Sequence, residues 1–287
     1  MRDIAKPLRV ASYHFRHITA TPRIPVVFLM EALFIWENLR RVAVFSASVG
    51  IPASPCAFSH LTNDFVCQLV MMAGVIIIFC DAPFRDEGFI YLLPRAGRSS
   101  WALGQILCIV GMAFLYVLFL LLMSILPLAG HLELGNQWGK IWGTLAKTDA
   151  GAAFGITLSV SEYMVTCFPA VKALLVSIAL EWACVVWLGL FIYFLNGLTD
   201  SPSGTVAGAF CILLDICIAN DWTHWANRFS PITLAQLNSY SGYSLMYNIT
   251  LDYGVRFFSV GIGVLFVLGI LSNYKEKLGN FFQIRGE

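Results

Sequence analysis

The chain has 287 residues, of which 58% are hydrophobic and 12% are charged, and its mean hydropathy is +0.75. Soluble globular domains carry about 25% charged residues, so this composition excludes an ordinary soluble domain and is typical of a protein that crosses a membrane several times. The net charge of +1 argues against a nucleic-acid partner.

Residues 1–18 place basic side chains among apolar ones, namely Arg2, Lys6, Arg9 and Arg16. This mixture predicts either a helix that lies in the membrane interface, with its basic side toward lipid headgroups, or a solvated basic tail. The residues alone leave both alternatives open.

The first span is expected from about Thr19 to Trp36, because the apolar stretch Ile24–Trp36 alone is shorter than the ~20 residues that cross a bilayer. This placement requires the long side chain of Arg23 to reach the cytoplasmic headgroups.

Three charges, on Glu37, Arg40 and Arg41, are expected to end the first span, since charged side chains are costly in mid-membrane. Residues 44–60 follow, with one glycine and two prolines. They are expected to form an outer loop.

Two clearer spans are expected at Phe65–Cys80 and from Trp101 to about Leu126. Between them lies the connector, residues 81–100, which holds six charged residues and two prolines. Ser99 or Ser100 is expected to cap the helix that follows the connector.

The second half of the chain predicts three further spans, at Phe168–Leu195, from Thr205 to about Ala219, and at Phe257–Ser272. Residues 196–204 are interpreted as the turn between the first two of these. The aromatic-rich residues 220–254 are interpreted as an external helical region, in which Ser230 and Pro231 open a short helix.

The distribution of basic residues supports six spans with both termini in the cytoplasm, because 11 of the 18 Lys and Arg residues then lie on the inner side. A seventh span at residues 151–167 would weaken this bias, so that segment is expected to be a shallow or external helix. The predicted fold is therefore all-α, with one transmembrane domain over residues 1–287 in the cell membrane.

No nucleotide-binding loop, metalloprotease motif or hydrolase motif is present in the sequence, which predicts no catalytic, metal or cofactor site. The eight cysteines lack metal-ligand spacing and are interpreted as small core residues. The chain is therefore not expected to be an enzyme by itself.

Four ionisable side chains fall within or near the expected spans, and intramembrane charges are functional candidates because each costs ~2.5–3.5 kcal/mol at a helix centre. Either they form a proton or ion site, or they make structural polar contacts between helices. These residues are Glu31, Lys172, Glu181 and Asp215.

The connector has two interpretations. It is either a charged loop that obeys the positive-inside rule, or a short helix over residues 86–93, ended by Pro94, that docks into a groove of a soluble partner. In the second case Phe89, Tyr91 and Leu92 supply the contacts, and charged residues lie at the rim. The candidate coupling residues are Arg85, Asp86, Glu87, Phe89, Tyr91, Arg95 and Arg98.

Several short segments resemble one family. They are DAPF (81–84), Tyr91, RAGRSSWALGQIL (95–107), WG with TLA (142–146), and FSP (229–231). Together with the six-span order, they are similar to the type-2 permeases of ATP-binding-cassette (ABC) transporters in their Gram-positive bacterial form. The chain departs from that pattern in its short first span, which carries Arg23 and Glu31.

The resemblance implies a membrane subunit that pairs with a second permease subunit, identical or different, and binds two copies of a cytoplasmic ATPase subunit. ATP and magnesium would be bound by that partner and not by this chain. The connector would form the coupling helix, residues 1–18 an interfacial helix, and the short helices before the last span would line the outer side.

The function expected from this resemblance is ATP-driven efflux of an amphipathic cargo, such as a peptide, a drug or a lipid-like molecule. Two alternatives stay open. One is a secondary transporter that uses an intramembrane carboxylate, although no convincing internal repeat is present. The other is a membrane enzyme or a scaffold that transports nothing.

Overall fold

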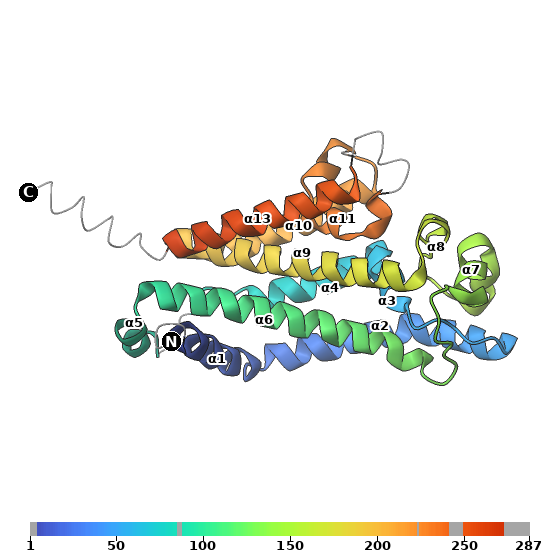
Figure 1. Cartoon of the computed structure of the whole chain (residues 1–287), viewed down its shortest axis with the longest axis horizontal. Helices are drawn as coiled ribbons and strands as arrows, with labels where there is room; N and C mark the ends of the chain where they lie inside the picture. Colours follow the sequence, from blue (N-terminus) through green and yellow to red (C-terminus); the bar gives the residue numbers. More distant parts are fainter. Residues whose placement is uncertain (1–4, 85–87, 223, 241–248, 273–287) are drawn as a thin grey trace, which may run out of the picture.

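The structure is a computed structural model that describes residues 5–84, 88–222, 224–240 and 249–272. Within these ranges it consists of helices and loops without a strand, and an isolated bridge joins Ala53 to Leu132. Figure 1 shows an elongated bundle in which the long helices run along the long axis. We call the end that carries residues 80–97 the connector end, and the opposite end the far end.

Three helices are long and apolar enough to cross a membrane. Two of them are α9 (Ala170–Thr199) and α13 (Leu251–Ser272). The third is the continuous helix Arg98–Leu128, which consists of α6 (Arg98–Ile125) and the short turn η1 (Leu126–Leu128). Two bent pairs qualify when each pair is counted as one span. They are α1 (Ala5–Thr19) with α2 (Arg23–Val49), bent by 67°, and α3 (Ala57–Asn63) with α4 (Phe65–Phe79), bent by 85°.

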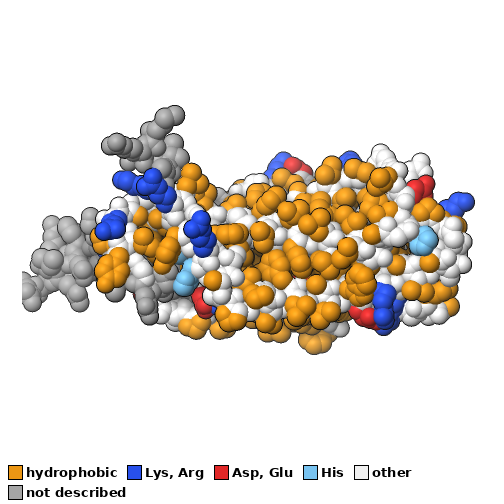
Figure 2. Space-filling view, turned by 90° about the horizontal axis from the view of Figure 1, so that it is seen from below, with side chains coloured by type: hydrophobic (Ala, Val, Ile, Leu, Met, Phe, Trp, Pro, Cys, Tyr) orange, Lys and Arg blue, Asp and Glu red, His pale blue; other side chains and the backbone are white. Residues whose placement is uncertain are grey.

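The described chain thus has three to five candidate spans, which indicates a membrane protein. Helix α10 (Ser203–Ala219) is apolar but, at 17 residues, shorter than these spans. The all-helical class is confirmed for the described residues, whereas the count of six spans stays a prediction. Figure 2 shows the matching surface, with hydrophobic side chains over the middle and most of the visible basic side chains toward the two ends.

The N-terminal segment forms a helix, as one of the two alternatives predicted. Helix α1 buries Val10, His14 and Ile18, which recur every four residues on one face. That face lies against α6, where the absence of a side chain at Gly104 makes room for Val10. The basic residues Arg9 and Arg16 lie on the exposed side of α1.

The outer loop expected at residues 44–60 is mostly helical, whereas the end of the first span at Glu37, Arg40 and Arg41 stays a prediction. Helix α2 continues past Arg41 to Val49, so its last two turns replace the beginning of the expected outer loop, and α3 replaces its end. Glu37 pairs with Arg40 at 3.1 Å and with Arg41 at 3.0 Å along the helix surface. Because these i,i+3 and i,i+4 pairs satisfy the charges locally, the charges do not terminate the helix.

The helix expected in the connector exists, but its end was predicted wrongly. Helix α5 spans Phe89–Ala96 and passes through Pro94. It stops at Gly97, whose φ of 83° is unfavourable for other residues and whose N–H donates to Leu93 O at 2.9 Å. The same glycine precedes α6 without a side-chain cap, so the predicted cap at Ser99 or Ser100 was also wrong.

The turn predicted at residues 196–204 is shorter than expected, since α9 runs to Thr199 and α10 starts at Ser203. The single helix expected at residues 151–167 is also absent. Instead η2 (Asp149–Phe154) closes at Gly155, where φ is 63°, and α8 (Glu162–Cys167) starts at its cap Ser161. Neither piece is long enough to span a membrane.

The far end carries α7 (Gly139–Lys147) and α8 (Figure 1). Residues 224–240 contribute η3 (His224–Arg228), α11 (Pro231–Ala235) and η4 (Leu237–Tyr240). The predicted start of α11 is confirmed, because Ser230 caps it by accepting from Thr233 N and Pro231 takes the first helical position.

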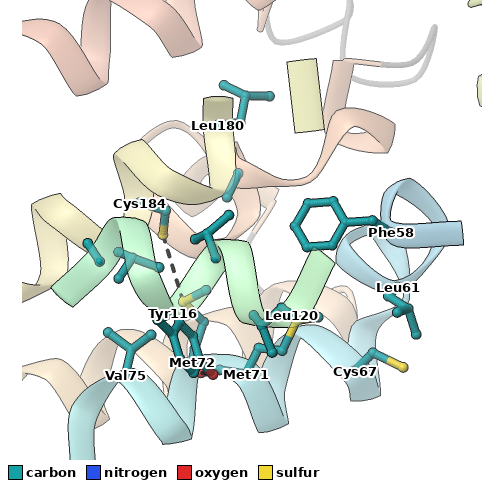
Figure 3. Packing of buried hydrophobic residues seen from close by; sticks show 14 of the residues in the cluster. Phe58, Leu61, Cys67, Met71, Met72, Val75, Tyr116, Leu120, Leu180 and Cys184 are labelled. Carbon is teal, nitrogen blue, oxygen red and sulfur yellow. Dashed lines mark hydrogen bonds between the residues drawn. The ribbon is translucent and has the colours of Figure 1, made fainter. Parts of the chain in front are cut away.

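The core joins helices α4, α6 and α9 through apolar side chains. Figure 3 shows Met71 and Met72 of α4 beside Tyr116 of α6, and the thiol of Cys184 on α9 lies 3.9 Å from the sulfur of Met72. All eight cysteines are free, which agrees with their interpretation as small packing residues for the four that are buried: Cys56, Cys67, Cys108 and Cys184.

Candidate functional site at the connector end

Helix α5 lies beside α1 and α6 at the connector end (Figure 1), and none of its residues from Tyr91 to Ala96 is buried. Tyr91 is 75% exposed and Arg95 is also exposed, whereas Leu92 and Arg98 are half-buried. Phe89 begins the helix. Three of the predicted coupling residues, Arg85, Asp86 and Glu87, lie outside the described residues.

The segment that leads into the connector, Cys80–Phe84, is held by side chains of several helices. On α6, Gln105 is fully buried, and its carboxamide accepts from Phe84 N at 3.0 Å and donates to Phe84 O at 3.1 Å. The same nitrogen lies 3.4 Å from Nε2 of His14, which joins α1 to the contact. One amide therefore links the connector to two helices.

A second amide, that of Asn196 near the end of α9, binds the same segment. Its Nδ2 donates to Cys80 O at 3.1 Å and to Ala82 O at 2.7 Å, while its Oδ1 accepts from Gly204 N at 2.7 Å. The hydroxyl of Thr205 on α10 donates to Cys80 O at 3.0 Å. Because Asn196 uses its side chain in this way, α9 continues through a residue that was expected to start a turn.

An ion pair completes the contact: Arg23, at the start of α2, binds the carboxylate of Asp81. We call the Cys80–Phe84 backbone with the side chains of Arg23, Gln105, Asn196 and Thr205 the connector anchor. Beside it, an open groove of about 270 Å³ lies between residues 80–83 and the turn at 200–202.

In the connector anchor, a segment that precedes the exposed helix α5 in the chain is bonded to four helices. These helices are α2, α6, α9 and α10. Buried amides with both ends satisfied hold backbone in one arrangement, since breaking them leaves unpaired polar groups. The Cys80–Phe84 backbone is therefore held by side chains of four helices of the bundle.

Comparison with protein-family models, with curated proteins and with solved structures found no match. The functions expected from the resemblance in the sequence therefore stay proposals.

Two of the four predicted intramembrane candidates lie together, and the other two do not belong to that group. Glu31 of α2 and Glu181 of α9 are fully buried in the middle of the bundle, with Gln68 of α4 and Tyr116 of α6. We call these four side chains the carboxyl cluster. Asp215 of α10 lies apart from them and accepts a hydrogen bond of 2.6 Å from Thr233. Lys172 is exposed, with its ammonium 6.0 Å from the ring of Phe168.

The described residues contain no group of three or more His, Cys, Asp or Glu side chains that could hold a metal ion. Sequence reasoning missed the connector anchor, although one signal was present. Gln105 and Asn196 are single amides inside long apolar helices, and a buried amide requires hydrogen-bond partners. The sequence does not show which backbone groups these partners are.

Proposed function

We propose that this chain is the membrane-spanning subunit of an ATP-driven exporter of the ABC type, with the connector end in the cytoplasm. Two copies of a separate ATPase subunit would bind ATP and magnesium, and a second permease subunit would complete the transport path. The six spans of this proposal are α2, α4, α6, α9, α10 and α13. The cargo class that we propose is amphipathic.

The observation that carries the proposal is the connector anchor beside an exposed helix. An ATPase subunit that grips α5 would move Cys80–Phe84, and four helices are bonded to that segment. Coupling of this kind requires an element whose two arrangements are biased by the partner's nucleotide state. The lack of a nucleotide loop in this chain is consistent with fuel supplied by another subunit.

The experiment reverses the connector charges by Arg85→Glu, Asp86→Arg and Glu87→Arg together in the full chain. We expect the variant to reach the membrane and to lose both ATP-driven transport and co-purification of a subunit with a nucleotide loop. The matched control reverses two exposed charges at the far end, Glu133→Lys and Lys140→Glu, and should keep both properties.

Full transport by the connector variant would overturn the coupling role. Transport that follows an ion gradient without ATP would favour the secondary-transporter alternative instead. Multi-turnover chemistry by the purified chain alone would favour a membrane enzyme.

A further inference from the structure

The carboxyl cluster combines two acidic side chains with no basic one. Glu31 and Glu181 are each 0% exposed, and no Lys or Arg of the described chain pairs with either. An ionised carboxylate without a partner is costly in a dry helix bundle, about 2.5–3.5 kcal/mol at a helix centre on insertion scales. The surroundings therefore favour the protonated, neutral form of these carboxyl groups.

The hydroxyl of Tyr116 gives the clearest chemical constraint on Glu31. It donates its single proton to Met71 O at 2.8 Å, so toward any other neighbour it can only accept. Glu31 Oε1 and this hydroxyl both lie close to Gly74. A Cβ atom added to Gly74 would lie 2.6 Å from Glu31 Oε1 and 2.8 Å from Tyr116 Oη. Since the single proton of Tyr116 is already used, a hydrogen bond between these two oxygens requires a proton on Glu31.

Both oxygens of Glu31 lack a hydrogen-bond donor among the described residues. Glu181 is better supported, since Gln68 Nε2 donates to its Oε2 at 3.0 Å, but its Oε1 has no partner within the described chain. The other titratable groups that face the pair are Tyr116 from α6, Cys67 from α4 and Cys184 from α9. None of them brings positive charge.

We propose that the carboxyl cluster is a proton-binding site, in which Glu31 holds a proton and donates it in a hydrogen bond to Tyr116 Oη. Release of this proton to bulk water would leave a charge between α2, α4 and α6 and would favour their separation. A metal cation fits less well, because no group of three or more His, Cys, Asp or Glu side chains among the described residues is placed to hold a metal ion.

This inference concerns the charge state of one buried group and does not depend on whether ATP drives transport. Full transport by the connector variant would overturn the coupling role and leave the proton site untouched, so the two proposals can fail separately.

The test is infrared difference spectroscopy of the purified full chain in lipid membranes, titrated from acidic to alkaline pH. At neutral pH we expect a carbonyl band of a protonated carboxylic acid that is lost in Glu31→Gln. Glu162→Gln is the matched control, because Glu162 is exposed and lies outside the carboxyl cluster, so this variant should keep the band. The second variant, Tyr116→Phe, removes the acceptor and should shift the same band to higher frequency.

An ionised carboxylate band assigned to Glu31 at neutral pH would overturn the proposal. If that carboxylate band moves when sodium is added, the cluster binds a cation and the proton site is also rejected. Should Glu31→Gln fail to fold, Tyr116→Phe decides the question: a shift of the band to higher frequency supports the proposal, and an unchanged band overturns it.

Discussion

The connector anchor and the carboxyl cluster are both sets of buried polar side chains in an apolar bundle, yet their chemistry differs. In the anchor, Gln105 and Asn196 use both ends of their amides in hydrogen bonds to backbone. In the cluster, Glu31 has no donor among the described residues and Gln68 leaves its Oε1 without a partner there.

This difference shows that buried polar side chains can serve two purposes. Satisfied amides fix a backbone segment and give one arrangement, which suits an element that transmits movement. Unsatisfied carboxyl groups are costly in one protonation state and tolerable in the other, which suits an element that responds to a ligand. The anchor should therefore dominate stability, and the cluster should dominate pH response.

The largest effect on stability is expected from Asn196→Ala, which removes three hydrogen bonds and leaves Ala82 O and Gly204 N without their partner. We expect a loss of about 3–4 kcal/mol, since each unsatisfied buried group costs ~1–3 kcal/mol. Unfolding of the purified chain in detergent measures it. The control Asn220→Ala removes one exposed contact and should change stability by no more than about 0.5 kcal/mol.

The second largest effect is expected from Gln105→Met, which keeps the side-chain length and removes both bonds to Phe84. Stability should fall by about 2–3 kcal/mol. Gln137→Met changes an exposed amide at the far end and is the control. Equal stability of the two variants would show that the anchor does not hold the connector.

Gly74→Ala tests the close packing of the carboxyl cluster. The new methyl group overlaps Glu31 Oε1 and Tyr116 Oη, so we expect a loss of about 1–3 kcal/mol from overpacking. Gly111→Ala in α6 has no atom within 4 Å of the added carbon and should raise helix stability by about 0.5–1 kcal/mol. The same thermal unfolding assay should give opposite signs, and a stabilising Gly74→Ala would refute the packing.

The smallest effect on stability is expected from Tyr91→Ala, because this side chain is 75% exposed. The free energy of unfolding should change by less than about 0.5 kcal/mol. Transport should fall if Tyr91 contacts the ATPase subunit. A variant that keeps full transport would remove Tyr91 from the coupling residues.

Much of the helical fold could be predicted because apolar runs are long and their ends are marked by turn residues. The stretch from Trp101 to Leu126 lies within one continuous helix, Arg98–Leu128, and Ser230 with Pro231 starts α11 as expected. Local signals failed where charges pair along one helix, as Glu37 does with Arg41, or where a side chain binds a distant segment, as Asn196 does.

The candidate site could be predicted only as single residues. Glu31 and Glu181 were recognised because carboxyl groups are rare in apolar spans, but their shared cluster depends on the packing of α2 and α9 around α4 and α6. The partners of Gln105 are backbone atoms of Phe84, and backbone groups carry no signature in a sequence.

The most direct measurement places a photo-crosslinking residue at Tyr91 in the full-length chain in its native membrane, with the same residue at Leu134 as control. Both positions are exposed, at 75% and 86%, and they lie at opposite ends of the bundle. We expect Tyr91 to crosslink to a subunit that carries a nucleotide-binding loop and Leu134 not to do so. A crosslink from Leu134 to that subunit, or none from Tyr91, would contradict the assignment of the connector end as the docking surface.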